Sequence, residues 1–367
     1  METSHLDIKS NDYFISHILI RWYDQNKRDL PWRETKDPYF IWLSEIILQQ
    51  TRVIQGYDYY MRFTEAFPTV ASLANADEDE VLKLWQGLGY YSRARNLHTA
   101  AKMIMSQYGG IFPSKYEDIL SLKGVGEYTA AAIGSFAFEL PHAVVDGNVF
   151  RVLSRLFAIS TPIDTTQGKK LFTDLANELL DVNNPGAHNQ AIMEFGALQC
   201  VPASPNCSVC PLSDICMAFS QAKVSSYPVK QGKTKIKERY FNYLDIRVGS
   251  SMFLNKRTAN DILKNLYELP LVETDEKLTL DELQKTDAFR AIFDNAGDIS
   301  VHPMGITLKH VLSHRIIYAN FYTIEISEDT LIKEKYLKID KADLFDFAIS
   351  RLVDRYFEHL NQGDLFA

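Results

Sequence analysis

The sequence predicts two domains, an all-α region followed by a smaller α+β domain. The chain has 367 residues, more than one hydrophobic core usually holds. From residue 13 to about residue 218, apolar residues recur at steps of three and four, as in helices buried on one face. A stretch rich in Lys, Ser, Gly and Gln follows, and after it apolar and polar residues alternate as in strands. We therefore expect a helical region over 1–220, a linker over 221–238 and an α+β domain over 239–367.

Breakers divide the helical region into separate expected helices. These cover 12–26, 38–54, 56–66, 78–86, 92–108, 115–121, 127–138, 147–158, 167–181 and 188–198. In the second domain, β-branched and aromatic runs predict strands at 240–248, 251–255 and 318–326, and helical periodicity predicts helices at 280–295 and 343–359.

The composition, with 46% hydrophobic and 23% charged residues, is that of a soluble globular protein. A formal net charge of −8 argues against capture of nucleic acid by the chain as a whole, although it allows a local basic surface. Residues 1–12 are polar and lack the apolar core of a secretory signal, and no apolar run reaches membrane-spanning length. We expect a cytoplasmic protein without membrane contacts.

All four cysteines lie in one stretch, as Cys200, Cys207, Cys210 and Cys216, spaced C-x6-C-x2-C-x5-C. Four thiolates in so short a run indicate a metal cage or two cramped disulfides. Structural zinc sites usually have two C-x2-C pairs and this chain has one, whereas the long first gap suits a cluster held at four corners. The spacing favours a [4Fe–4S] cluster, with zinc and disulfides as alternatives, and clustered cysteines of this kind fit a reducing compartment.

A glycine hairpin, Leu122-Lys123-Gly124-Val125-Gly126, separates two expected helices. Two glycines around one small apolar residue allow a tight turn whose backbone N–H groups point outward at the start of the next helix. Such a turn can hold a DNA phosphate without a charged side chain. A simple helix–helix turn is the alternative, because glycine pairs are common in turns.

Two carboxylates have unlike expected surroundings. Glu45 lies beside Trp42 and Leu48 on an apolar helix face, and burial there would raise its pKa and make it a proton donor near neutral pH. An edge position that reaches solvent is the alternative. Asp146 precedes an apolar-periodic helix, so we expect an N-cap that the helix dipole and free N–H groups keep ionised. One protonated and one charged carboxyl are the pair that glycosidic cleavage needs.

Two further stretches carry side chains suited to DNA. Gln49, Gln50 and Thr51 follow Glu45, and Gly87-Leu88-Gly89-Tyr90-Tyr91 closes another expected helix. Amides and aromatics beside loops are the usual means of reading base edges and of wedging between base steps. Core packing of the tyrosines is the alternative.

Together these features resemble the helix-hairpin-helix DNA glycosylases of the endonuclease III superfamily, over residues 13–218. Within that superfamily the sequence is similar to the MutY-type adenine DNA glycosylases: the run Trp42–Thr51 resembles their catalytic helix, and Leu30-Pro31-Trp32-Arg33, Gly87–Tyr91 and Val145-Asp146-Gly147-Asn148 resemble their other characteristic stretches. The resemblance implies a monomer that removes adenine mispaired with 8-oxoguanine, or with guanine, from double-stranded DNA, and a bacterial, nucleoid-associated location. It also implies a mostly α helix-hairpin-helix fold with an Fe–S cluster loop.

One position bears on the type of reaction. Endonuclease III-like enzymes have a Schiff-base lysine just after the hairpin, and Tyr128 stands in its place here. An imine needs an amine nucleophile, so the resemblance implies a monofunctional glycosylase that leaves an abasic site. A bifunctional glycosylase/lyase and a non-catalytic Fe–S DNA-binding module are the alternative functions.

The resemblance also implies roles for individual residues. Glu45 would protonate the leaving base at N7, Asp146 would stabilise or capture the sugar, and Tyr128 and Asn148 would hold the carboxylates and the water. The cluster would be architectural, with the loop Val201–Asn206 contacting phosphate. The residues implied in DNA binding are Arg33, Gln50, Thr51, Tyr90, Leu122, Gly124, Val125, Gly126, Ser313 and His314.

The second domain resembles the Nudix-like C-terminal domain of the same family. Asn265-Leu266-Tyr267-Glu268-Leu269-Pro270 is similar to a Gly-Leu-Trp-Glu-Phe-Pro stretch, with Asn for Gly and Tyr for Trp. Leu312-Ser313-His314 resembles the Phe-Ser-His loop that reads 8-oxoguanine. No metal-binding Nudix box follows Gln221, so we expect lesion recognition rather than pyrophosphatase activity.

Overall fold

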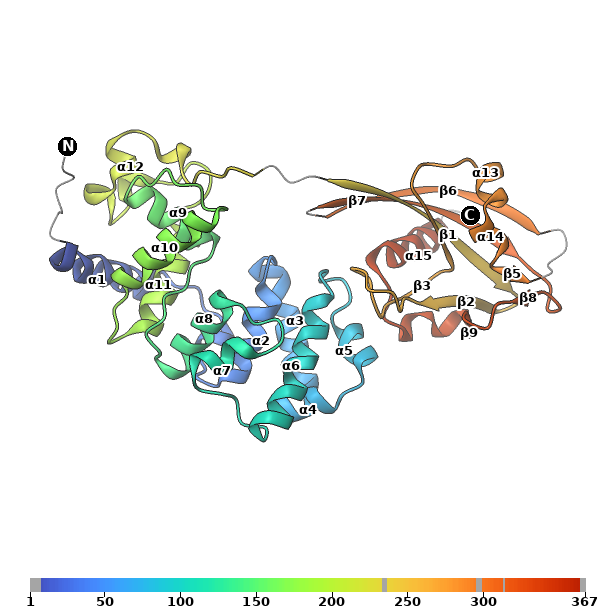
Figure 1. The fold of residues 1–367 in the computed structure, drawn as a ribbon, viewed down its shortest axis with the longest axis horizontal. Coiled ribbons are helices and arrows are strands. Elements are labelled where there is room, and N and C mark those ends of the chain that lie inside the picture. The colour runs from blue at the N-terminus through green and yellow to red at the C-terminus, as the bar shows by residue number, and fades with distance from the viewer. Residues whose placement is uncertain (1–7, 233–235, 295–298, 313, 364–367) are drawn as a thin grey trace. The chain divides into compact units, whose positions relative to one another are not determined.

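The computed structural model describes residues 8–232, 236–294, 299–312 and 314–363, and these form two compact units (Figure 1). The first unit consists of residues up to Ala74 together with Thr99–Gly232. The second consists of Asn75–His98 and the residues from Lys233 onward. The segment Asn75–His98, which periodicity alone groups with the helical region, is thus part of the C-terminal unit.

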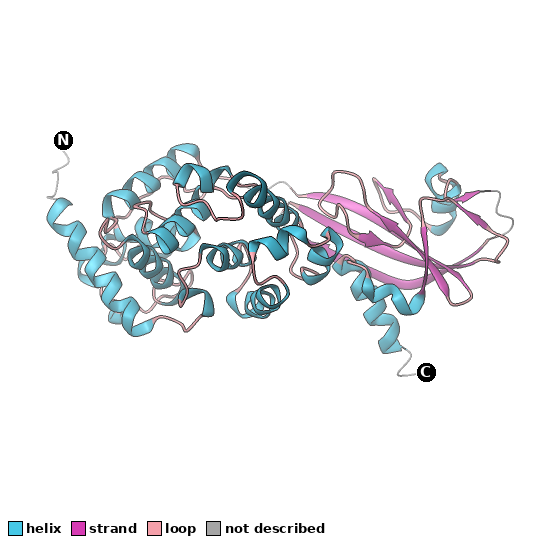
Figure 2. Ribbon diagram, turned by 90° about the horizontal axis from the view of Figure 1, so that it is seen from below, coloured by secondary structure: helices cyan, strands magenta, loops and turns pink. Residues whose placement is uncertain are grey.

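Helices account for the regular structure of the described residues up to position 232 (Figures 1 and 2). The α-helices are α1 (Ile8–Asn26), α2 (Pro38–Leu48), α3 (Val53–Ala66), α4 (Val70–Asn75), α5 (Glu78–Leu84), α6 (Ser92–Tyr108), α7 (Tyr116–Ser121), α8 (Glu127–Phe138), α9 (Gly147–Leu156), α10 (Thr166–Leu179), α11 (Pro185–Leu198) and α12 (Met217–Ser220). None of the described helices is long and apolar enough to cross a bilayer.

The predicted helices over 38–54 and 56–66 are both present, but the break between them lies earlier than predicted. α2 ends at Leu48 and α3 begins at Val53. Between them Gln50 has a φ of 54°, in the left-handed region that ends a right-handed helix. The apolar periodicity runs on through this break, so the sequence pattern could not reveal it.

Helix α8 lies at the centre of the first unit. It packs against α2, α7 and α11, and nearly all of its residues after Tyr128 are buried, many of them alanine or glycine. Small side chains allow neighbouring helices to approach closely. The start of α8 and the middle of α2 are thereby brought to the same cavity.

The strands of the described residues all lie in the second unit (Figure 2). They are β1 (Lys237–Val248), β2 (Ser251–Lys256), β3 (Tyr267–Glu268), β4 (Leu271–Thr274), β5 (Phe293–Asp294), β6 (Ser300–Val311), β7 (Arg315–Glu325), β8 (Leu331–Ile332) and β9 (Leu337–Asp340). The main sheet has the order β3-β2-β1-β7-β6, with β4 pairing with β1 and β9 with β2. β1 and β7 are parallel, and β6 and β7 form an antiparallel hairpin.

Alternation along β1 divides its side chains between two hydrophobic clusters. Phe241 and Tyr243 belong to one, with residues of α15 (Arg351–Gly363), whereas Leu244 and Ile246 belong to the other, with Leu283 and Phe289 of α13 (Leu280–Lys285) and α14 (Asp287–Arg290). The helices therefore cover the two faces of the sheet, and the predicted order of an all-α region followed by an α+β domain is confirmed.

Three predictions for the second unit need correction. The predicted helix over 280–295 is two short helices, α13 and α14, and Phe293–Asp294 pairs with β8 as a strand. In the segment 343–359, a 3-10 helix (Lys341–Asp346) precedes α15. Strand β6 was not predicted, because it is a largely exposed edge strand with Pro303 and Gly305 at a register shift, and such a strand lacks clean alternation.

Candidate active site

A cavity of about 850 Å³ lies within the first unit. Its wall brings together α2, the turn after α2, the starts of α8 and α9, and one face of α11. The predicted site residues that line it are Arg33, Glu45, Gln50, Thr51, Gly126, Tyr128, Asp146 and Asn148. Residues distant in sequence thus share one chamber.

Glu45 is the buried acid of this cavity. Its helix begins at Asp37, which caps the Tyr39 amide at 2.9 Å, and Pro38 occupies the first turn. Every residue from Ile41 to Ile47 is buried, and Glu45 is the only charged one among them, at 8% exposure. The expected apolar setting is therefore observed, and the solvent-exposed alternative is wrong.

The surroundings of Glu45 favour its protonated form. Burial raises its pKa to about 7, and the negative charge of Asp146 acts in the same direction. The Tyr128 hydroxyl donates a 2.8 Å hydrogen bond to Glu45 Oε2 and partly opposes that rise. Near neutral pH this carboxyl can therefore both carry a proton and give it up.

Asp146 is the N-cap of α9, as predicted. Its Oδ1 accepts from the Asn148 and Val149 amides at 2.9 and 2.8 Å, and Asn148 Nδ2 donates to its Oδ2 at 2.7 Å. Burial nevertheless raises the pKa of Asp146, against the pull of these hydrogen bonds and of Arg151. The expectation that the helix terminus dominates its ionisation is thus corrected, because the helix start lies in the cavity wall rather than in solvent.

A third carboxylate of the same cavity, Glu194 on α11, has a contrasting environment. It is 1% exposed, and burial alone would raise its pKa. Arg33 donates to both of its oxygens at 2.8 and 2.7 Å, and Arg28 donates to the same oxygens. These bonds outweigh burial and lower its pKa to about 2.

Arg33 has a partner within the protein, and its predicted contact with DNA stays a prediction. Its guanidinium is 13% exposed and is held by Glu194 in the cavity wall. Arg28 and Glu194 were missed by the sequence analysis, since nothing local links residues more than 160 positions apart. The sequence signal that could have indicated this ion pair is the position of Glu194 among apolar residues of the expected helix 188–198.

The glycine hairpin joins α7 to α8, as predicted. Val125 N donates to Leu122 O at 3.1 Å, and Gly124 has a φ of 80° that favours glycine. The side chains of Leu122 and Val125 are buried, whereas Gly124 and Gly126 are exposed. Gly126 is the N-cap residue of α8, and because it has no side chain the first amides of the helix have no side-chain cap there.

The turn after α2 also lines the cavity. Gln49 Nε2 donates to Thr129 Oγ1 at 3.3 Å, which fixes the turn against α8, and Gln50 is exposed with Thr51 half-buried beside it. The left-handed backbone of Gln50 projects this turn away from the axis of α2.

The remaining predicted DNA-binding residues belong to the second unit. Tyr90 is 43% exposed and has a left-handed backbone, with a φ of 48°. Tyr91 is 4% exposed, so the alternative of core packing is correct for this tyrosine. His314 is exposed, and its carbonyl accepts from the Lys237 amide at 3.0 Å. Ser313 lies outside the described residues.

The four cysteines line one small cavity and none is paired in a disulfide. Val152, Leu156, Phe195 and Leu212 contribute apolar walls. Arg155 Nη1 lies 3.4 Å from Cys200 Sγ, which places a positive charge where thiolates would gather. In the part of the chain that the structure describes, no three His, Cys, Asp or Glu side chains converge closely enough for one metal ion.

Two buried arginines of α9 connect the cysteine loop to the cavity, and sequence reasoning missed both. Arg151 donates to Asn148 Oδ1 at 2.8 Å and to Cys200 O at 2.7 Å. Arg155 donates to the Val201 and Pro202 carbonyls at 2.8 and 2.9 Å. Their i,i+4 spacing, directly after Asp146, was the signal that could have indicated them.

Comparison with known proteins agrees with this architecture. Residues 43–178 match the HhH-GPD superfamily of base excision DNA repair proteins, and residues 243–359 match the NUDIX domain. A thermostable thymine-DNA glycosylase is 29% identical, with a TM-score of 0.54 over 58% of this chain and 98% of that one. An endonuclease III–DNA complex, 21% identical with a TM-score of 0.51, covers 60% of this chain and 99% of its own and shares the fold. The fold and the site thus define a helix-hairpin-helix base-excision DNA glycosylase.

The relatives narrow the class further. The adenine DNA glycosylase of Buchnera aphidicola subsp. Acyrthosiphon pisum is 33% identical over 331 residues, which is 89% of this chain and 91% of that protein. Those of Schizosaccharomyces pombe, 33% identical over 89% of this chain and 85% of that protein, and of Homo sapiens, 44% identical over 54% and 38%, are similar as well. The chain belongs to the adenine DNA glycosylase family, with a C-terminal Nudix-like domain, and the resemblance found in the sequence is confirmed.

Proposed function

We propose that this enzyme excises adenine opposite 8-oxoguanine, or guanine, in double-stranded DNA by hydrolysis and leaves an abasic site. The observation that carries the proposal is the carboxyl pair of the cavity. Glu45 is buried, which raises its pKa to about 7, while Asp146 accepts three hydrogen bonds at the start of α9. Two acids in unlike environments are what glycosidic cleavage requires.

The first step breaks the bond between adenine and deoxyribose. The base is extruded into the cavity, because its glycosidic bond cannot be reached within the stack. Glu45 transfers its proton to the base, at N7 by family resemblance, and the electron pair of the C1′–N9 bond leaves with neutral adenine. General acid catalysis of this kind contributes about a hundredfold to ten-thousandfold.

The second step restores the enzyme. The sugar is left with positive charge at C1′, and the Asp146 carboxylate stabilises it or captures it covalently. That developing charge also favours the ionised form of Asp146 over the form that burial favours. Glu45, now a carboxylate, accepts a proton from water as the water oxygen bonds to C1′. Where Asp146 had captured the sugar, its bond to C1′ breaks in the same step and the electron pair returns to the Asp146 carboxylate.

Tyr128 and Asn148 act by positioning. The Tyr128 hydroxyl donates to Glu45 Oε2 at 2.8 Å, and Asn148 Nδ2 donates to Asp146 Oδ2 at 2.7 Å, so both carboxyl groups are fixed in orientation. Because Tyr128 stands where a lyase would have a lysine, no amine is offered for an imine at that position. The reaction therefore ends at the abasic site.

The DNA-facing elements follow from exposure. The exposed glycines Gly124 and Gly126 before α8 suit a phosphate, and the exposed Gln50 with Thr51 suits the strand opposite the extruded base. In the second unit, Tyr90 and the loop Leu312–His314 would contact the 8-oxoguanine strand, as the family resemblance implies. A monomer that acts on chromosomal DNA in the cytoplasm, associated with the nucleoid, is part of this proposal.

We assign a [4Fe–4S] cluster to Cys200, Cys207, Cys210 and Cys216. The support is four unpaired thiols set around a cavity instead of a single point, which suits a multi-atom cluster better than one zinc ion. When bound, the cluster would supply structure, fixing the loop Val201–Asn206 for phosphate contact. Brown protein with about four irons per chain is expected, whereas colourless protein with one zinc would contradict the assignment.

An alkali-split cleavage assay tests the activity. Duplexes that hold one A·8-oxoG, A·G or A·T pair are incubated with enzyme, and each sample is divided between hot alkali and neutral buffer. Strand breaks are expected only after alkali, with A·8-oxoG cut fastest. Breaks without alkali would instead support a lyase, and no breaks under either condition would support a binding module.

A further inference from the structure

The second unit contains a polar contact between the first turn of α5 and a loop of the sheet. Lys256 Nζ lies 2.7 and 2.8 Å from the two oxygens of Asp79, and the Tyr267 hydroxyl donates to Asp79 Oδ2 at 2.9 Å. Asn265 Nδ2 donates to Glu78 Oε1. Lys256 also lies 5.0 Å above the Tyr267 ring. Two adjacent acids thus meet three donors from one short stretch of the sheet.

Backbone conformation sets the direction of the Asn265 side chain. Its φ is 66°, and its amide donates to Arg257 O at 2.7 Å. Glycine and asparagine are the residues that adopt this region at least cost. Glycine would satisfy the turn, but only asparagine also supplies a donor toward Glu78.

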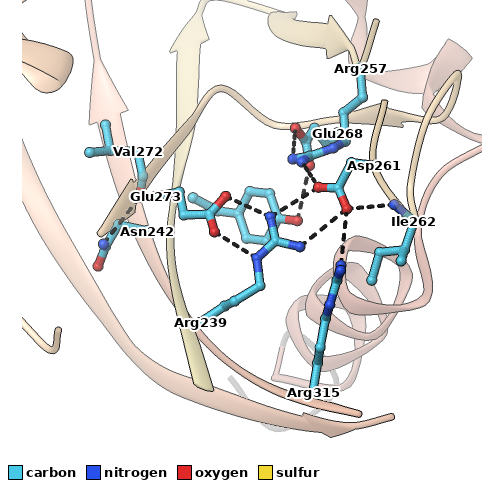
Figure 3. A network of polar contacts seen from close by, with 10 residues as sticks. Arg239, Asn242, Arg257, Asp261, Ile262, Glu268, Val272, Glu273 and Arg315 are labelled. Carbon is cyan, nitrogen blue, oxygen red and sulfur yellow. Dashed lines mark hydrogen bonds and ion pairs between the residues drawn. The ribbon is translucent and has the colours of Figure 1, made fainter. Parts of the chain in front are cut away.

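A charged network holds the loop in shape (Figure 3). Arg239 donates to Glu273 at 2.6 Å and to Asp261 at 2.9 Å, and Arg257 donates to Asp261 and, at 2.8 Å, to Glu268. Most of these groups are nearly buried, with Glu268 at 1% exposure. Paired charges removed from solvent fix geometry more firmly than exposed ones.

Further contacts lie along the same segment. Lys83 Nζ donates to Phe347 O at 3.0 Å, the Ile349 amide donates to Gln86 Oε1 at 3.3 Å, and Arg95 Nη1 donates to Lys264 O at 2.7 Å. Contacts to the sheet domain therefore occur on both sides of the turn Gly87–Tyr91 in the sequence.

We propose that Lys256, Asn265 and Tyr267 form a clasp that holds the segment Asn75–His98 on the sheet domain and so positions the turn that carries Tyr90. These are positioning residues, which act through Glu78 and Asp79. The clasp stands on the contacts above, whereas its effect on DNA recognition rests on the proposed role of Tyr90. The C-terminal domain then has two tasks, reading the lesion strand and holding a turn from the first hundred residues.

Hydrogen exchange of the full chain tests the clasp without reference to catalysis. Asn265→Gly keeps the left-handed turn, Tyr267→Phe keeps the ring, and the double variant removes two donors, so the fold is preserved. Amides of residues 78–91 are expected to exchange roughly tenfold faster in the double variant, because two hydrogen bonds that hold the segment are removed. Amides of α8 and α9 should not change. Unchanged exchange over 78–91 in a folded double variant would overturn the proposal.

A charge exchange separates the clasp from general stability. Lys256→Asp should accelerate exchange over 78–91, and adding Asp79→Lys should restore it. Lys338→Asp breaks a similarly exposed pair with Glu328 in the same unit and should leave 78–91 unchanged. Failure of the swap to restore protection, or an equal effect of the control, would count against a specific contact.

The functional consequence is measured separately. Single-turnover assays of the double variant are expected to show about fivefold weaker binding of the A·8-oxoG duplex, with an unchanged rate at saturating enzyme. A changed saturating rate with unchanged binding would overturn the positioning role while leaving the glycosylase proposal intact. If the wild-type chain released no adenine, only the glycosylase proposal would be contradicted, because hydrogen exchange does not depend on catalysis.

Discussion

Helices α2 and α11 each place one glutamate in the wall of the same cavity, and the two differ widely in acidity. Glu45 is 8% exposed and has a pKa of about 7, whereas Glu194 is 1% exposed and has a pKa of about 2. Burial raises the pKa of both carboxyl groups. The difference is that two arginines donate to Glu194, while a neutral tyrosine hydroxyl donates to Glu45.

A third glutamate, Glu268 in the sheet domain, extends the comparison of carboxyl pKa values. Glu268 is 1% exposed, and burial raises its pKa to about 7 although Arg257 and Tyr243 donate to it. Glu268 accepts from one arginine, whereas Glu194 accepts from two. Cationic donors therefore act against burial in setting which carboxyl is a proton donor and which a structural anion.

Replacing Glu45 with Gln tests the acid side of this comparison and has the largest expected effect. The variant should bind the mismatch duplex but release adenine about a hundredfold to ten-thousandfold more slowly, because the leaving base is no longer protonated. Single-turnover kinetics measure this, with the exposed Glu127→Gln as a control. Activity within about tenfold of wild type would remove Glu45 from the acid role.

Asp146→Asn separates the charge of Asp146 from its cap. Asparagine caps helices about as well as aspartate, so stability in urea should change by less than about 0.5 kcal/mol. Base release should fall about a hundredfold, because no carboxylate faces the sugar cation. A variant that loses stability and activity in parallel would indicate a structural role alone.

Arg33→Met tests the paired carboxylate. Removing one partner leaves Glu194 with Arg28 as its remaining cationic partner, and we expect a loss of about 3 kcal/mol in the free energy of unfolding at pH 7. Because the folded pKa of Glu194 lies near 2, below its unfolded value, the stabilisation is present above about pH 4.5 and is lost as pH falls toward 2. The variant should lose this acid dependence, whereas Arg62→Met, on an exposed helix face, should not.

The pH dependence of stability that Glu45 contributes is opposite in direction to that of Glu194, and Glu45→Gln tests it. The folded pKa of Glu45 lies above its unfolded value, so the wild type loses stability as pH rises from about 4.5 to 7, by up to about 3 kcal/mol. Glutamine cannot ionise, and the variant should be about 2 kcal/mol more stable than wild type at pH 8 and nearly equal at pH 4. Urea midpoints at the two pH values decide the matter. A destabilised variant at pH 8 would contradict the assigned pKa.

Tyr128→Phe gives the smallest effect. The wild-type rate should decline above about pH 7, as Glu45 loses its proton. Without the hydroxyl that stabilises the carboxylate, this decline should move up by less than about one pH unit, since one hydrogen bond is worth about 1 kcal/mol. The pH profile of single-turnover rates measures it. A downward move would mean that the hydroxyl does not donate to Glu45.

Local pattern was sufficient for much of this protein. Helical periodicity up to residue 218, alternation after residue 240, the glycine hairpin before α8 and the cap at Asp146 all follow from neighbours in the sequence, and the structure has each of them. The apolar face around Glu45 was also readable, because a carboxyl among Ile, Trp and Leu at helical spacing is buried wherever that helix packs.

Tertiary structure decided the rest. The ion pairs of Glu194 join residues more than 160 positions apart, and the segment Asn75–His98 groups with strands that begin at Lys237. Whether the pKa of Asp146 is raised or lowered depends on how deeply the start of α9 is buried. The ion pair of Arg33 depends on Glu194, which lies far away in the sequence. The sequence thus determined most of the helices and identified Glu45 as the acid with apolar neighbours. Charge balance in the cavity arises only when distant helices meet, because electrostatic energy depends on distance in space and not along the chain.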